Sequence, residues 1–209
     1  MVLVMDYLLF SKAIFVGFAI AAPVGPIGLI CIQRTLIQGS KSGLASGFGA
    51  ATADAIYGAI GAFSLTALTH VLTSAAKPLA IFGIIFLIWL GVKFLRSDNQ
   101  NQVTQEVLSN NALVSFVSTF LLTIANPITI LSFIAVFASM GGNMSLDTGS
   151  AGIMVLGVFL GSVVWWLSLV AVVTLIKHKI NSDTLKWISR TAGIFLLGFA
   201  GWQLMVLIQ

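Results

Sequence analysis

Charged residues are scarce in this chain. Asp, Glu, Lys and Arg make up 8% of its 209 residues and hydrophobic residues 58%, whereas a soluble domain carries roughly 25% charged residues. A soluble fold could not cover its surface with this composition, so the chain is an integral membrane protein. The net charge of +4 comes from scattered basic residues and gives no reason to expect nucleic acid as a partner.

Cysteine and enzyme motifs are also missing. Cys31 is the single cysteine, which excludes an internal disulfide. The sequence contains no Walker A motif, no Gly-x-Ser-x-Gly, no His-Glu-x-x-His and no cluster with metal-ligand spacing. We therefore expect neither an ATPase nor a membrane hydrolase, and no catalytic residue, metal or cofactor.

Six apolar segments are present, each suited to crossing ~30 Å of hydrocarbon with about 20 residues. We place Pro78 in the first turn of the third segment, and residues 97–111 (SDNQNQVTQEVLSNN) form a polar linker. The chain is thus one transmembrane domain with two halves, residues 1–96 and 112–209. The six segments are residues 13–33, 44–69, 79–95, 112–138, 151–176 and 187–208.

The two halves predict an all-α membrane protein of two inverted three-helix repeats, because an odd number of spans reverses the second half. A weak internal match supports this. Gly25-Pro26 corresponds to Asn126-Pro127 on the first helix of each half. On the second helix, Gly49-x4-Asp54-x2-Tyr57 corresponds to Gly157-x4-Ser162-x2-Trp165.

Proline motifs interrupt the first helix of each half, at Pro23-x-Gly25-Pro26 and at Asn126-Pro127. Proline removes a backbone N–H and clashes with the preceding turn. Lipid cannot satisfy the freed backbone groups, so each break must face protein, a cavity or a ligand. A plain kink tolerated by neighbouring helices is the alternative. If the breaks are real, each creates a half-helix N-terminus, and such termini bind carboxylates.

Asp54 is the only carboxylate well inside a span. An ionised carboxylate at that depth costs at least ~2.5 kcal/mol, so Asp54 must face a polar cavity, pair with another group or be protonated. It is either a structural partner or a coupling group that titrates with H⁺ or binds a substrate ammonium. With the helix N-termini it would complement a zwitterionic amino acid. Tyr57, Trp165 and Trp166 are candidates to line the cavity, or to serve packing alone.

Glycines at four-residue spacing predict close helix packing. Gly39, Gly43 and Gly47 fall on one helix face, and so do Gly157 and Gly161. The glycine pattern says little about function.

Basic residues predict the orientation, because Lys and Arg concentrate on the cytoplasmic side. Only Lys12 and Lys77 lie on the opposite face. The linker and the first and last loops are then cytoplasmic, and both termini lie outside the inner membrane. The residues on the predicted cytoplasmic side are Arg34, Lys41, Lys93, Arg96, Lys177, Lys179, Lys186 and Arg190.

The motifs resemble a known family. Residues 23–29 (PVGPIGL), the glycines that follow and Asp54 resemble the first signature of the lysine exporter (LysE) family, which includes the homoserine and threonine exporters. Asn126-Pro127 resembles the motif that opens that family's second half. The resemblance implies a small exporter of amino acids or related metabolites, driven by an ion gradient. The spaced proline motif, and Ala53 where the family has glycine, indicate a divergent subgroup.

The leading hypothesis is therefore a secondary exporter of amino acids with H⁺ antiport, embedded in the bilayer and free to form homo-oligomers. A transporter of divalent cations or another solute is a rival, although Asp54, Asn126 and a few hydroxyls are a thin ligand set. A membrane-embedded enzyme or assembly factor would need a second titratable group near Asp54, and no span supplies one.

The predicted orientation can be tested by thiol labelling. A cysteine placed in the linker, between residues 97 and 110, should react with an impermeant reagent only from the cytoplasmic side. A cysteine near Ser145 should react only from outside. The reverse pattern would refute the orientation.

Overall fold

The computed structural model describes residues 2–23, 25–63, 66–96, 111–139, 147–180 and 182–208, and every element in these ranges is helical. The predicted linker, 97–111, lies outside them except for Asn111. The elements are α1 (Val2–Ala21), α2 (Pro26–Gln38), α3 (Ser40–Ala62), α4 (Thr66–Arg96), α6 (Ala112–Ile124), α7 (Pro127–Ser139), α8 (Thr148–Ile176), the short η1 (Lys177–Lys179) and α9 (Ser182–Ile208).

Helix starts and turns are encoded locally. The Asn111 side chain accepts from the Leu113 N–H at 2.9 Å and caps α6, and Asp147 accepts from the Ser150 N–H at 3.0 Å and caps α8. Gly39 alone connects α2 to α3 with a φ of +94°, a conformation that glycine adopts without steric cost. Gly39 therefore makes a turn. The spacing predicts that it shares a helix face with Gly43 and Gly47, and for Gly39 this prediction is wrong.

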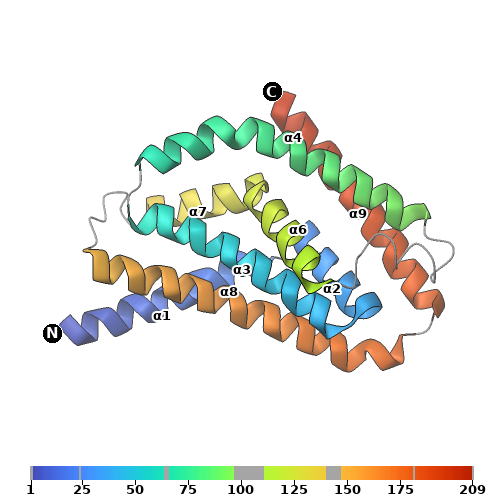
Figure 1. Ribbon diagram of the computed structural model, residues 1–209, viewed down its shortest axis with the longest axis horizontal. Coiled ribbons are helices and arrows are strands. Elements are labelled where there is room, and N and C mark those ends of the chain that lie inside the picture. The colour runs from blue at the N-terminus through green and yellow to red at the C-terminus, as the bar shows by residue number, and fades with distance from the viewer. Residues whose placement is uncertain are drawn as a thin grey trace.

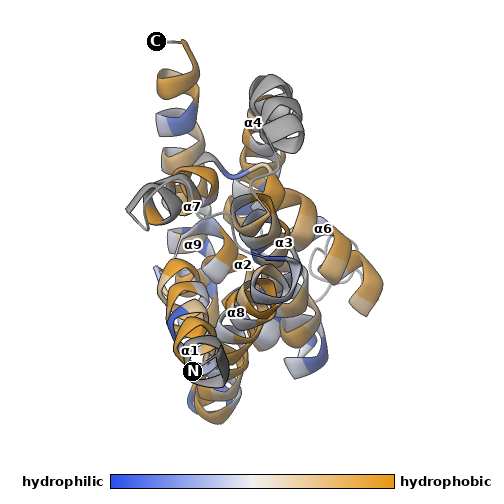
Figure 2. Ribbon diagram, turned by 90° about the vertical axis from the view of Figure 1, so that its left-hand side faces the viewer, coloured by the Kyte–Doolittle hydropathy of each residue, from blue (hydrophilic) through white to orange (hydrophobic). Residues whose placement is uncertain are grey.

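The surface is apolar and the interior holds polar groups, as expected for a protein whose solvent is lipid. Leu131, Leu175 and Ile194 are at least 60% exposed, whereas Gln33 and Ser162 are fully buried. Hydrophobic residues cover most of the described helices in Figure 2. By length and hydropathy α8 and α9 can each cross a membrane, and α1 with α2 passes the same test as a pair bent by 80°, which is the geometry of a broken span or a re-entrant loop. The fold class, an all-α membrane protein, is confirmed.

Helix α3 occupies the centre of the molecule. It packs along both α8 and α6, α1 packs along α8, and α4 packs along α9. In Figure 1, α4 runs along the top of the molecule and α8 along the bottom, with α3 between them. The α2–α3 and α8–α9 connections lie at the right-hand end, and the N-terminus lies at the left-hand end.

The predicted boundary between the second and third spans is wrong. Helix α3 ends at Ala62, α4 begins at Thr66, and Pro78 lies inside α4 instead of in its first turn. A continuous helix satisfies the backbone groups of residues 66–77 internally, which matters more in lipid than the one hydrogen bond that Pro78 removes. Helix α9 likewise begins at Ser182, five residues before the predicted start at Trp187.

Glycines bring the central helices into backbone contact. A Cβ on Gly49 would overlap the Phe116 carbonyl oxygen in α6, and a Cβ on Gly161 would overlap the Ile14 carbonyl oxygen in α1. A Cβ on Gly157 would lie 2.5 Å from the Ala13 Cβ, also in α1. The glycines of α3 and α8 therefore each accept a helix from the other half of the chain.

Gly161→Ala should destabilise the protein, because the new methyl group meets the α1 backbone, and overpacking of this kind costs about 1–3 kcal/mol. Gly152→Ala is the matched control on the same helix, since no atom lies within 4 Å of its Cβ position. The control should unfold at the wild-type temperature or above. The measurement is thermal unfolding of the purified protein in detergent, and equal unfolding temperatures for the two variants would contradict the packing argument.

Candidate functional site

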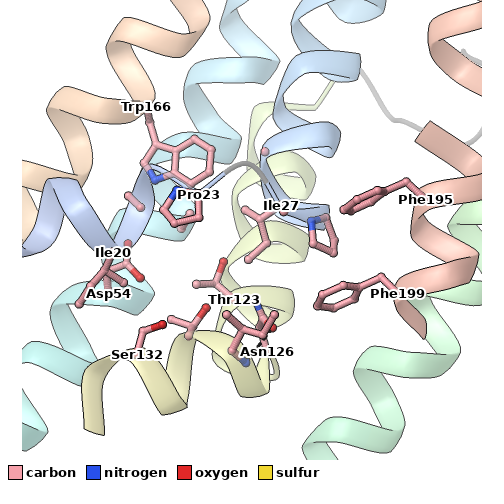
Figure 3. Close-up of a pocket in the computed structure, with 17 residues that line it drawn as sticks. Ile20, Pro23, Ile27, Asp54, Thr123, Asn126, Ser132, Trp166, Phe195 and Phe199 are labelled. Carbon is pink, nitrogen blue, oxygen red and sulfur yellow. Dashed lines mark hydrogen bonds between the residues drawn. The ribbon is translucent and has the colours of Figure 1, made fainter. Parts of the chain in front are cut away.

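A cavity of about 280 Å³ lies between the two halves. Its size is just below the range of roughly 300–1,000 Å³ typical of ligand pockets. The end of α1, the first turn of α2 and the centre of α3 form one side, and residues of α6, α7, α8 and α9 form the rest (Figure 3). Its polar side chains are Asp54, Thr123, Asn126, Thr129, Ser132 and the Trp166 indole.

The start of α2 faces this cavity. Pro26 is the first residue of the helix, and its N-cap Gly25 has an extended backbone (φ −98°, ψ −161°) and makes no side-chain capping bond. The Leu29 N–H already donates to the Gly25 carbonyl at 3.1 Å. Ile27 and Gly28 precede Leu29 in this first turn, where a helix start leaves the N–H groups without an intrahelical acceptor. Both residues line the cavity.

The start of α7 is built differently. The Asn126 side chain accepts a hydrogen bond from the Ile128 N–H at 3.2 Å, and the Ile130 N–H donates to the Asn126 carbonyl at 3.2 Å. Asn126 therefore caps α7 with its own oxygen. The two helix starts are not equivalent, and α2 is the one better able to receive an external anion.

Asp54, at the centre of α3, lines the cavity wall and is 3% exposed. Ser162 donates to its Oδ2 at 2.7 Å, and the Trp166 indole N–H donates to the Ser162 hydroxyl at 3.1 Å. This chain of hydrogen bonds joins α3 to α8. The cavity lining contains no Lys, Arg or His among the described residues, so Asp54 is its only ionisable side chain there.

Tyr57 supports the site from outside it. Its hydroxyl donates to the Ile124 carbonyl at 2.6 Å, and its ring stacks on Phe133 with centroids 5.5 Å apart. In a continuous helix the Ile124 carbonyl would accept from the Ile128 N–H, which here donates to Asn126 instead. Tyr57 therefore satisfies a carbonyl that the interruption between α6 and α7 leaves free.

Trp165 plays a comparable packing part in the other half. Its ring meets Phe18 of α1 edge to face, with centroids 5.4 Å apart, and it does not line the cavity. Trp166, which the sequence offered as an equal candidate, has its indole in the lining (Figure 3).

Of the nine site residues proposed from the sequence, five line the cavity: Pro23, Gly25, Pro26, Asp54 and Asn126. Ser162 donates a hydrogen bond to Asp54, and Pro127 is the first residue of α7. The remaining two, Tyr57 and Trp165, pack around the site.

Sequence reasoning did not include several lining residues in the site. Asn126, Thr129 and Ser132 share one helix face at three-residue spacing, and these polar residues in an apolar span were a usable signal. Phe195 and Phe199 of α9 gave no such signal. They close the side of the cavity opposite Asp54 (Figure 3), and only the packing of α9 brings them there.

Comparisons with known proteins identify relatives that match most of the chain. The chain is 24% identical over 199 residues to the "Putative amino acid efflux protein YcgF" of Bacillus subtilis (strain 168), a match that covers 91% of this chain and 92% of that protein. It is 24% identical to the "Chemotactic transduction protein ChpE" of Pseudomonas aeruginosa (strain PAO1), covering 92% and 96%. The "Uncharacterized membrane protein YahN" of Escherichia coli (strain K12) is 28% identical, covering 65% and 61%. No solved structure matches the chain.

The family model described as "LysE type translocator" matches residues 18–206, which include both proline motifs and Asp54. This confirms the resemblance seen in the motifs. The chain therefore belongs to the LysE type translocator family, and it is a transporter of the inner membrane rather than an enzyme.

Proposed function

We propose that the protein exports amino acids by H⁺ antiport. The observation that carries the proposal is the pair of opposite groups on the cavity wall, namely the Asp54 carboxylate and the uncapped N-terminus of α2. A carboxylate complements an ammonium, and a helix N-terminus complements a carboxylate. A zwitterionic amino acid presents both charges within the length of such a cavity.

The inverted repeat is part of this proposal. A two-fold axis that exchanges the halves relates α1 to α6 and α8 to α3. It therefore relates the packing of α1 on α8 to the packing of α6 on α3, and both contacts occur. The same exchange relates Asp54 to Ser162, and these two side chains hydrogen-bond to each other. Residues that a two-fold axis relates meet each other only near that axis. The contact therefore supports an axis through the cavity, where inverted-repeat transporters bind their substrates.

Coupling follows from competition for Asp54. The buried carboxylate can hold either a proton or a substrate ammonium, and holding both would leave a positive charge without a partner. When the cavity faces inward, the ammonium displaces the proton. When it faces outward, a proton displaces the ammonium and returns with the carrier. One carboxylate thus exchanges outgoing substrate for incoming H⁺.

The lining favours neutral amino acids. Asp54 supplies one carboxylate, and no second acidic residue among the described residues lines the cavity to receive another ammonium. The wall opposite Asp54 is apolar, with Phe195 and Phe199, and Ile20 and Ile27 lie beside the helix break (Figure 3). An apolar side chain can occupy this part of the cavity without the desolvation cost of a polar or charged one.

The proposed orientation keeps the α2–α3 and α8–α9 connections in the cytoplasm. Lys177 and Lys179 lie at the second of these connections, and Lys41 follows the first. The basic bias that supports this side does not depend on Arg34, whose side chain is buried.

Asp54→Asn should abolish coupling, because the amide keeps the shape but neither titrates nor neutralises an ammonium. Removing a charge from the membrane interior lowers the cost of insertion, so membrane levels should stay normal. The measurement is export of a panel of neutral amino acids in proteoliposomes, with and without an imposed pH gradient. Asp54→Glu should keep partial activity with a shifted pH dependence.

Asp183→Asn is the matched control. That carboxylate is 85% exposed and forms a long 3.9 Å ion pair with Lys186, an arrangement worth little energy. The control should keep wild-type export and coupling. An Asp54→Asn protein that still concentrates substrate at the wild-type rate would refute the proposal.

A further inference from the structure

Arg34 is the second buried charge of the structure, and the cavity does not include it. Its side chain is 3% exposed and lies between α2, α3 and α6. Nη1 donates to the Ser46 hydroxyl at 2.8 Å, the Ser115 carbonyl at 2.9 Å and the Thr119 hydroxyl at 2.7 Å. Nη2 donates to the Ser118 hydroxyl at 2.7 Å.

All of these acceptors are neutral. No carboxylate of the described residues forms an ion pair with Arg34. A buried cation without an anion is costly, because hydroxyls and a carbonyl replace only part of its hydration. Within the part of the chain that the structure describes, the positive charge of Arg34 therefore lies uncompensated inside the bundle.

The guanidinium also has an incompletely used edge. A guanidinium carries five N–H groups, and Nη1 places its two among three acceptors. Nη2 has one acceptor among the described residues, while Nε is buried and has none there. Nε and Nη2 form the planar fork that binds a carboxylate through two parallel hydrogen bonds. Nε and one N–H of Nη2 therefore have no acceptor among the described residues, and both nitrogens belong to the edge suited to a carboxylate.

The Arg34 side chain lies close to the cavity along the helices. Thr119 comes one turn before Thr123, and Ser46 comes one turn before Ala50; Thr123 and Ala50 both line the cavity. Along α2, Arg34 follows the lining residue Gly28 by six residues, about 9 Å at 1.5 Å per residue. The Arg34 cluster therefore closes the bundle between the cavity and the α2–α3 connection.

We propose that Arg34 is a second carboxylate-binding site, which the substrate occupies on its way between the α2–α3 end of the bundle and the cavity. The inference rests on the proposed function as an amino-acid exporter. When α2 separates from α3 and α6, the guanidinium loses hydroxyl acceptors, and the substrate carboxylate replaces them at the Nε–Nη2 fork. The ammonium then reaches Asp54, and the carboxylate passes to the start of α2.

The test compares neutral L-amino acids with their carboxamides, which keep the ammonium but lack the carboxylate. Each unlabelled compound competes with a radiolabelled amino acid in a counterflow assay in proteoliposomes. Wild-type protein should prefer the acid to the amide. Arg34→Gln should reduce that preference about 10- to 100-fold, the range expected for a lost hydrogen bond to a charged group. Arg34→Lys keeps the charge but lacks the two-nitrogen fork, so its preference for the acid should lie between those of the wild type and Arg34→Gln.

Ser46→Ala is the matched control. It removes one acceptor of Nη1 and weakens the contact between α2 and α3, but it leaves the Nε–Nη2 edge unchanged. It should affect the acid and the amide equally. Membrane level and a single symmetric peak in size-exclusion chromatography establish that each variant is folded. If Arg34→Gln is not folded by these criteria, the comparison is made with Arg34→Lys.

Equal losses of competition by acid and amide in the Arg34 variants would mean that Arg34 only joins α2 to α3 and α6, and would overturn the inference. An unchanged preference for the acid would overturn it as well. Either result leaves the exporter proposal standing, because transport is still measured. Wild-type protein that exchanges no amino acid would instead refute the proposed function, and this inference with it.

Discussion

A bilayer offers no hydrogen-bond partner to a buried backbone group or a buried charge, and the rest of this structure follows from that constraint. Where α6 ends, the Ile124 carbonyl receives the Tyr57 hydroxyl. Where the Asp54 carboxylate lies within a span, it accepts a hydrogen bond from Ser162, which in turn accepts one from Trp166. The first turn of α2 differs, because its N-cap residue Gly25 has no side chain that could accept a hydrogen bond from it. A site left open in such a solvent is the natural place for a ligand.

The two buried charges are kept apart. Asp54 bonds to α8, and Arg34 bonds to hydroxyls of α3 and α6, so neither neutralises the other. If they formed an ion pair, each would satisfy the other and a zwitterion would gain little by binding. Separation along the helices instead presents opposite charges in succession to a molecule that carries both. This arrangement gives the proposed exchange of proton and substrate a physical route through the bundle.

Much of the fold could be predicted because the signals were local. Composition indicated helices in lipid, and the proline motifs marked the ends of α1 and α6 within a few residues. The position of Asp54 was readable because an isolated carboxylate in an apolar span needs a reason to be there. Pro78 misled the prediction because helix continuity outweighed its local cost. The roles of Phe195, Phe199 and Arg34 depend on which helices pack together, and spacing along one chain does not contain that information.

The central claim is that the cavity between α2 and α7 is the substrate site, and a structure determined with a transported neutral amino acid bound tests it most directly. The account predicts density in the cavity, with the ammonium within hydrogen-bond distance of Asp54 and the carboxylate at the Ile27 and Gly28 N–H groups. An amino acid bound elsewhere, with the cavity unfilled and Asp54 still bonded to Ser162 alone, would contradict it.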